Sequence, residues 1–258
     1  MTHRPRISLI LPAFNEAATI ARTIGEAVAY FSRRGWTYQI IVAADGEDGT
    51  REIARRIALG NSSLIVIGSR ERLGKGRGVR AAMALAAGDI VGFADADNKV
   101  PIEEYDRIDA AFAQGFDMAI GSRAIPGSQV IREQPWFRRI GSRGFAIALH
   151  LIVGLEEFID TQCGFKFFRR DVAARIFALQ HIDGYMFDIE ILALAQRLGL
   201  RVAQVPIRWQ DDRDSRLELI RGNFENGRDL FRIRASLAAI EGAPITEKGT
   251  EKGRATYS

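Results

Sequence analysis

Two aspartates, Asp95 and Asp97, follow directly after an apolar run from Ile90 to Ala94. The run has the length and composition of a buried strand, so both carboxylates would leave the end of that strand, two residues apart. So placed, they can converge on one hard cation, or one can bind the cation while the other orients a sugar hydroxyl. Carboxylate, water and diphosphate oxygens are the ligands that Mg²⁺ and Mn²⁺ prefer. The alternative is a solvated acidic turn, but a place at a strand's carboxyl end favours a functional site.

Polar turns also follow the first two apolar runs. The first turn, PAFNE at residues 12–16, lacks the glycines of a dinucleotide-binding turn. It offers backbone groups and the Glu16 carboxylate to a base or ribose, and Asn15 can cap the next helix. In the second turn, Asp45 can accept a hydrogen bond from a base N–H or simply belong to a turn, while Asp48 can cap the following helix.

A glycine-rich string, GKGRG at residues 74–78, suggests an anion site. It is not a P-loop, because Gly68 lies too far upstream and no Ser or Thr follows Lys75. A glycine-rich loop that enters a helix still presents N–H groups and the helix dipole to an anion, and Lys75 and Arg77 add positive charge. The alternative is a flexible turn.

The single cysteine, Cys163, permits no intrachain disulfide and favours a reducing compartment. The three histidines, His3, His150 and His181, form no recognisable motif with it, so a buried structural thiol is favoured over a nucleophile.

The composition suits a folded α/β protein with a mild positive charge. The 258 residues are 47% hydrophobic and 26% charged, with a formal net charge of +4. Arginines gather at residues 132–143 and 201–234, which suits phosphate, anionic lipid or nucleic acid. No apolar run reaches the roughly 18–20 residues of a membrane span. We therefore expect a cytoplasmic protein, either soluble or bound to a membrane surface.

Apolar runs alternate with helical patterns through the first half, which predicts a mostly parallel sheet with helices on both faces. The predicted strands are Ile7–Leu11, Tyr38–Ala43, Leu64–Ile67, Ile90–Ala94, Phe165–Phe168 and Leu200–Trp209. The predicted helices are 17–32, 48–58, 76–87, 102–114, 136–155, 171–179, 186–198 and 217–238. Residues 121–135 are expected to form a polar loop, residues 1–240 a single domain, and residues 241–258 a disordered tail.

In this order, the motifs resemble those of the inverting family 2 glycosyltransferases, which have the GT-A fold. The strings that match are LPAFNE, DGEDGT, GKGRGVR and DAD. Within that family the chain is most similar to the polyprenyl-phosphate sugar synthases, through GSR, DTQCGFK, FDIE, and PIRW followed by Ser215-Arg216. The string DTQCGFK is more similar to dolichyl-phosphate glucosyltransferases than to mannosyltransferases, and the resemblance covers about residues 5–235.

The resemblance implies roles for particular residues. A nucleotide-sugar half at about 5–120 would bind UDP-glucose, and an acceptor half at about 121–240 would bind a polyprenyl phosphate. The residues implied for the nucleotide sugar are Pro12, Ala13, Glu16 and Asp45 at the nucleoside, Lys75 and Arg216 at the diphosphate, and Asp95 and Asp97 with Mg²⁺ or Mn²⁺. Those implied for the acceptor are Arg123 and either Arg138 or Arg139 at the phosphate, with Asp160 and Gln162 lining the loop.

Two departures from the family pattern bear on the donor. The family often has adjacent aspartates where this chain has Ala44-Asp45, and the loop here is one residue shorter. Lys99 stands where mannosyltransferases have a glutamine that helps hold the metal, so metal affinity could be lower or Lys99 could meet the diphosphate. Both departures weaken the mannosyl interpretation.

The expected reaction is a direct displacement by a phosphate. A phosphate monoester with a second pKa near 6 is already nucleophilic at neutral pH, so a cation and arginines suffice without a strong base. Displacement at an α-linked donor gives a β-linked product. The predicted helix 136–155 would lie in the headgroup layer or pack as a core helix, and a membrane partner protein is also possible. The product would form at the cytoplasmic face of a membrane.

Four alternatives remain at this point. They are a GDP-mannose-dependent synthase, a family 2 transferase with a soluble acceptor, a non-catalytic nucleotide-sugar binder, and a nucleic-acid module. The intact DAD motif argues against a non-catalytic binder. Stacking aromatics are not grouped near the arginines beyond Trp136 and Phe137, so we expect no nucleic-acid partner.

Overall fold

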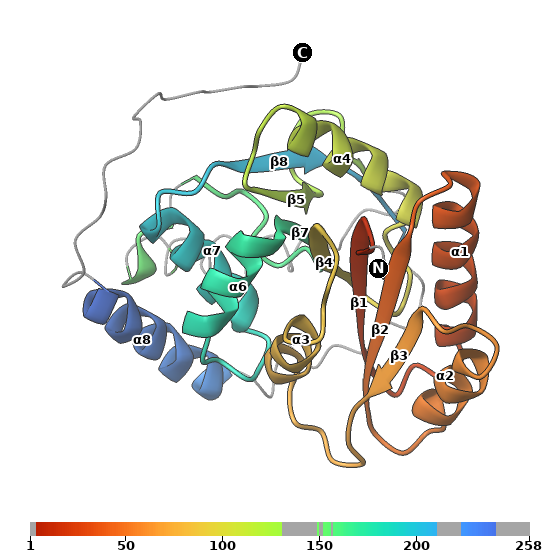
Figure 1. Ribbon diagram of the computed structural model, residues 1–258. Helices are drawn as coiled ribbons and strands as arrows, with labels where there is room; N and C mark the ends of the chain where they lie inside the picture. The colour runs from red at the N-terminus through yellow and green to blue at the C-terminus, as the bar shows by residue number, and fades with distance from the viewer. Residues whose placement is uncertain (1–3, 131–148, 150–151, 156, 211–222, 241–258) are drawn as a thin grey trace.

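A seven-stranded sheet forms the centre of the protein, as shown by a computed structural model that describes residues 4–130, 149, 152–155, 157–210 and 223–240 (Figure 1). The strand order is β3-β2-β1-β4-β7-β5-β8, and β7 runs antiparallel to both of its neighbours. The other pairings in this sheet are parallel. The predicted mostly parallel sheet is therefore confirmed, and its strands come from both predicted halves of the chain.

The first half alternates strand and helix as expected. Its elements are β1 (Ile7–Phe14), α1 (Ile20–Arg33), β2 (Tyr38–Asp45), α2 (Thr50–Ala58), β3 (Leu64–Ile67), α3 (Lys75–Met83), β4 (Ile90–Ala94), the 3₁₀ turn η1 (Ile102–Glu104) and α4 (Tyr105–Ala113). The expectation that Asn15 caps α1 is wrong: Asn15 adopts a φ of 57°, and the helix begins later because the N–H groups of Thr19 and Ile20 both bond to the Glu16 carbonyl.

The second half contains two strands that the sequence analysis did not predict: β6 lies within the expected polar loop 121–135, and β5 begins before that loop and ends in it. Its elements are β5 (Met118–Ser122), β6 (Gln129–Val130), β7 (Phe165–Arg169), α6 (Arg170–Leu179), α7 (Phe187–Arg197), β8 (Val202–Pro206), β9 (Arg208–Trp209) and α8 (Asn223–Ile240). Strand β5 is buried along its whole length between β7 and β8, although its apolar run is only Met118-Ala119-Ile120. The predicted closing strand is divided, because β9 leaves the main sheet to pair with β6.

Helices cover both faces of the sheet, as predicted. One hydrophobic cluster joins α1, α2 and α4 to one face, with Phe31 and Tyr105 among its largest buried side chains. A second cluster joins α3, α6 and α7 to the other face, around Phe93, Phe168 and Phe187. Helix α8 lies outside α7 (Figure 1), where Leu230 and Ile233 are buried, while Phe231 and the arginines of the helix are exposed. This is the amphipathic pattern expected of a C-terminal helix.

Strands β1, β2 and β4 are parallel neighbours, so their carboxyl ends lie at one edge of the sheet. Phe14 at the end of β1 pairs in register with Asp45 at the end of β2, and β4 ends immediately before Asp95. The predicted nucleotide and metal residues therefore share this edge. Within the described part of the chain, no helix combines the length and apolarity that crossing a bilayer requires.

Candidate functional site

The Asp95–Asp97 pair lies at the carboxyl edge of the sheet, just beyond β4. The Asp95 N–H donates to the Gly164 carbonyl at 3.1 Å, which joins this turn to the start of β7. A Cβ atom on Gly164 would lie 2.1 Å from Asp95 Oδ2, so only glycine leaves room for the carboxylate. Both aspartate side chains are partly exposed, at 42% for Asp95 and 27% for Asp97. The turn thus presents two carboxylates to solvent in a constrained position.

Each of these carboxylates is paired with a lysine. Lys75 Nζ lies 2.6 Å from Asp95 Oδ1, and Lys99 Nζ lies 2.9 Å from Asp97 Oδ2. Burial raises the pKa of Asp97, and the charge of Asp95 adds to that rise. Burial alone would lower the pKa of Lys75, but Asp95 and Asp188 outweigh it and raise the pKa, so Lys75 is charged.

The residues expected at the nucleoside lie beside this pair. Pro12 and Ala13 lie near the carboxyl end of β1, where they pair in register with Ala43 and Ala44 of β2. The Glu16 carboxylate accepts a hydrogen bond from the Thr19 hydroxyl at 2.9 Å. Burial raises the pKa of Glu16, and the charges of Asp97 and Asp95 add to the rise. Glu16 is therefore within electrostatic reach of the two aspartates.

Asp45 has a structural role that the sequence analysis did not anticipate. Its two carboxylate oxygens accept the backbone N–H groups of Ser69 at 3.0 Å and Leu73 at 2.9 Å. Asp45 thereby orders the loop that leads into α3 and Lys75. Each oxygen can accept more than one hydrogen bond, so this role leaves the predicted base contact open. Asp48 accepts the Thr50 N–H at 3.0 Å just before α2, but the N-cap residue of that helix is Gly49 and not the predicted Asp48.

On the acceptor side, Arg123 and Asp160 form a two-pronged ion pair. Arg123 Nε and Nη2 each donate to Asp160 at 2.8 Å, and the Arg123 backbone N–H donates to the same carboxylate at 2.9 Å. Burial alone would raise the pKa of Asp160, but Arg123 outweighs burial and lowers it. The guanidinium carries five N–H donors, so donors remain beyond the two that Asp160 accepts. Gln162 is exposed on the same loop.

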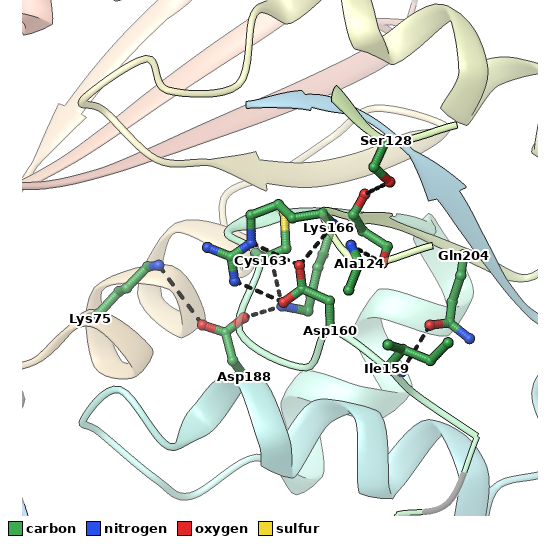
Figure 2. Close-up of polar contacts among 11 residues, drawn as sticks. Lys75, Ala124, Ser128, Ile159, Asp160, Cys163, Lys166, Asp188 and Gln204 are labelled. Atoms are coloured by element: carbon green, nitrogen blue, oxygen red, sulfur yellow. Dashed lines mark hydrogen bonds and ion pairs between the residues drawn. The ribbon is translucent and has the colours of Figure 1, made fainter. Parts of the chain in front are cut away.

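Sequence reasoning missed a buried ion pair behind these residues. Lys166 is fully buried on β7, and its Nζ donates to Asp188 Oδ1 at 2.5 Å and to the Cys163 carbonyl at 2.6 Å. The other oxygen of Asp188 lies 3.8 Å from Lys75 Nζ, and Figure 2 shows Asp188 between the two lysines. The signal was a lysine inside the apolar string FKFF, because a charge buried on a strand needs a partner.

Cys163 is a buried structural residue, as expected. Its side chain is 2% exposed, and burial raises the pKa of its thiol to about 12. A thiol with that pKa is neutral near pH 7 and is no nucleophile. Arg138, Arg139 and Arg216 lie outside the described residues, so their predicted contacts stay predictions.

The described residues fit a divalent cation that is shared with a diphosphate. Among them, no cluster of three or more His, Cys, Asp or Glu side chains has the geometry of a complete metal cage. Two carboxylates at i and i+2 instead suit Mg²⁺ or Mn²⁺, which is commonly held by one or two carboxylates together with substrate phosphates and water. Asp95 and Asp97 are the residues that would hold the ion.

Comparison with known proteins agrees with this geometry. The family model for "Glycosyl transferase family 2" matches residues 8–177. The dolichyl-phosphate β-glucosyltransferase of Drosophila melanogaster is 34% identical over 88% of this chain and 74% of its own length. The human enzyme of that name is 28% identical over 89% of this chain and 75% of its own length.

Solved structures show the same fold. The glucosyl-3-phosphoglycerate synthase of Mycobacterium tuberculosis superposes with a TM-score of 0.60 at 25% identity, covering 93% of this chain and 82% of that one. A complex of that enzyme with Mn²⁺, UDP-glucose and phosphoglyceric acid gives a TM-score of 0.62 at 24% identity, covering 93% and 81%. With the DAD carboxylates at the sheet edge and the family model covering most of the chain, this protein is a glycosyltransferase of family 2.

Proposed function

We propose that this protein transfers glucose from UDP-glucose to the phosphate of a polyprenyl lipid, with inversion at the sugar. The observation that carries the proposal is the 34% identity to a dolichyl-phosphate β-glucosyltransferase over 88% of the chain. The Arg123–Asp160 pair supports it, because Asp160 holds the guanidinium in a fixed direction within electrostatic reach of Asp95, where an acceptor phosphate would have to lie.

In this proposal each group of residues has one task. Pro12, Ala13 and Glu16 bind the nucleoside at the ends of β1 and β2. A divalent cation held by Asp95 and Asp97 would supply charge stabilisation for the departing diphosphate. Lys75 and Arg216 add positive charge to the diphosphate. The N–H groups of Arg77 and Gly78 at the start of α3 take no part, because they already donate to the Asp183 carbonyl at 3.2 Å and to the Gly74 carbonyl at 3.0 Å.

The acceptor side needs to position a nucleophile and not to deprotonate one. The second pKa of a phosphate monoester lies near 6, so the acceptor is already an anion at neutral pH. Arg123 would orient that anion, with Arg138 or Arg139 as a second contact and Gln162 on the loop. Asp160 stays ionised because Arg123 lowers its pKa, and its task is to fix the direction of the guanidinium. We place the reaction at the cytoplasmic face of a membrane, where the lipid acceptor would be held.

The test offers two donors and two acceptors. Radiolabelled UDP-glucose and GDP-mannose are each incubated with a short-chain polyprenyl phosphate or with 3-phosphoglycerate, in Mn²⁺, and label is followed into organic solvent. We expect transfer from UDP-glucose to the lipid alone. Equal or faster transfer from GDP-mannose would refute the proposed donor. Formation of a labelled, water-soluble glycoside of 3-phosphoglycerate would refute the proposed acceptor.

A further inference from the structure

The lysines of the site are arranged around the two metal-type carboxylates and not around an open anion site. Lys75 contacts Asp95 at 2.6 Å, and Lys99 contacts Asp97 at 2.9 Å. Both lysines are largely buried, with side-chain exposures of 16% and 20%. Both carboxylates that would bind a metal cation are therefore already paired with a lysine ammonium group.

The charges of this cluster balance internally. It consists of three carboxylates and three ammonium groups: Lys75 links Asp95 to Asp188 and Lys166 in the core, and the Asp97–Lys99 pair is within electrostatic reach of Asp95. A divalent cation added alone would leave two uncompensated positive charges in a partly buried site, which is costly. A divalent cation together with the two negative charges of a sugar diphosphate restores the balance.

Glu16 also faces this cluster. Its carboxylate is engaged by the Thr19 hydroxyl and is coupled electrostatically to Asp95, Asp97 and Lys99. Counted with the cluster, Glu16 adds one negative charge, so a divalent cation added alone would still leave one positive charge uncompensated. It does not change the requirement that both lysines lose their partners when a cation binds.

Asp188 can remain the ion-pair partner of Lys75 when the contact between Lys75 and Asp95 is broken. Asp188 Oδ2 lies 3.8 Å from Lys75 Nζ, while Asp188 Oδ1 is held at 2.5 Å by the buried Lys166 (Figure 2). A small movement can thus transfer Lys75 from Asp95 to a diphosphate without leaving a buried charge unpaired.

We propose that Lys75 and Lys99 are internal counter-ions that reserve Asp95 and Asp97 until a nucleoside diphosphate arrives. The diphosphate accepts the two ammonium groups, and only then are both carboxylates open to a divalent cation. Asp188 is a positioning residue that keeps Lys75 within reach of both partners. This inference rests on the proposed function, because the donor's diphosphate is the group that accepts the lysines.

The proposal predicts strong coupling between cation and nucleotide binding. Mn²⁺ affinity is measured from the electron paramagnetic resonance signal of free Mn²⁺, without nucleotide and with UDP or GDP. For the wild type we expect weak Mn²⁺ binding alone and binding at least about tenfold tighter with the preferred nucleotide, the scale of one charge-assisted contact. The nucleotide must gain the same factor from Mn²⁺, because coupling is reciprocal.

Lys99→Met is the informative variant, and Lys75→Met tests the second lysine. Each should bind Mn²⁺ without nucleotide about tenfold tighter than the wild type, and the nucleotide effect should shrink by the same factor. Arg70→Met is the matched control, because it removes one positive charge from an 82% exposed side chain that pairs with Glu47. It should leave Mn²⁺ affinity unchanged.

The inference is overturned if neither lysine variant binds Mn²⁺ more tightly than the wild type, or if Arg70→Met gains as much as they do. Failure of the proposed function looks different. Coupling of Mn²⁺ to GDP in place of UDP would refute the donor and keep the lysine role. Coupling to UDP without any transfer of label to lipid would refute the acceptor and keep the lysine role.

Discussion

Replacing Asp160 by asparagine should both destabilise the protein and weaken its use of the acceptor. The change keeps the shape of the side chain but removes the charge that faces Arg123 across two contacts of 2.8 Å. Asp160 is 8% exposed and Arg123 28% exposed, so water can replace little of the lost interaction. Removing one partner of a buried ion pair costs about 3–5 kcal/mol, and the partial exposure of Arg123 favours the lower end, about 3 kcal/mol.

A loss of about 3 kcal/mol corresponds to a fall in Tm of roughly 6–12 °C for a protein of this size. The assay combines chemical denaturation with steady-state kinetics at varied acceptor. Because Arg123 would lose its fixed direction, we expect the acceptor KM to rise at least about tenfold while binding of UDP is nearly unchanged.

The control is Asp109→Asn, which breaks a similar two-contact pair with Arg6 at 2.9 Å on the surface. Exposed pairs contribute about 0–1 kcal/mol, so this variant should lose little stability. The reasoning is refuted if Asp160→Asn is no less stable than Asp109→Asn. An unchanged acceptor KM in a clearly destabilised Asp160→Asn would instead show that the pair is structural and that Arg123 does not meet the acceptor.

The remaining predictions concern four positions. Asp97→Ala should abolish transfer with little loss in the free energy of unfolding, since burial and the charge of Asp95 both disfavour the ionised Asp97 and so offset the lost contact with Lys99; full activity in excess EDTA would contradict the metal role. Gly164→Ala should cut transfer strongly, because its Cβ would meet the Asp95 carboxylate at 2.1 Å, and wild-type rates would show that Asp95 need not hold its place. Tyr105→Phe should leave the unfolding free energy unchanged or raise it by about 1 kcal/mol, because the buried Tyr105 hydroxyl has no hydrogen-bond partner among the described residues; a clear loss in denaturation would reveal one. Because the pKa of Asp160 is lowered in the folded protein, its ion pair with Arg123 contributes fully to stability above the unfolded-state pKa of about 3.9. That contribution is lost as the pH falls through the lower pKa of the folded state. The wild type should therefore lose its stability advantage over Asp160→Asn below about pH 4.

Most of the first half could be predicted from the sequence because its strands are continuous apolar runs. β3 and β4 have the predicted bounds, and β1 and β2 extend only a little further, through Pro12-Ala13-Phe14 and Ala44-Asp45. Strand β5 escaped prediction because its apolar run is three residues long, and its burial comes from β7 and β8, which are far away in the sequence. When a strand is buried by segments that are distant in the sequence, its own residues need show no hydrophobic periodicity that would predict it.

The site could be predicted where one residue type and one strand end define the chemistry. Asp95 and Asp97 satisfy that condition, and Arg123 and Asp160 were each expected on the acceptor side. Their mutual pairing could not be predicted, because β5 was not recognised and the two residues are 37 positions apart, with no sequence pattern that fixes how they pair. The lysine contacts were missed for the same reason, since Lys75, Lys166 and Asp188 come from α3, β7 and α7.

The most direct test of the central claim is the linkage in the product. Purified protein is incubated with UDP-glucose, Mn²⁺ and a short-chain polyprenyl phosphate, and the lipid product is examined by proton NMR at the anomeric position. We predict a single β-linked glucosyl phosphate on the lipid, formed by one direct displacement. An α-linked glucosyl phosphate, or no glucosylated lipid while UDP-glucose is consumed, would contradict the account.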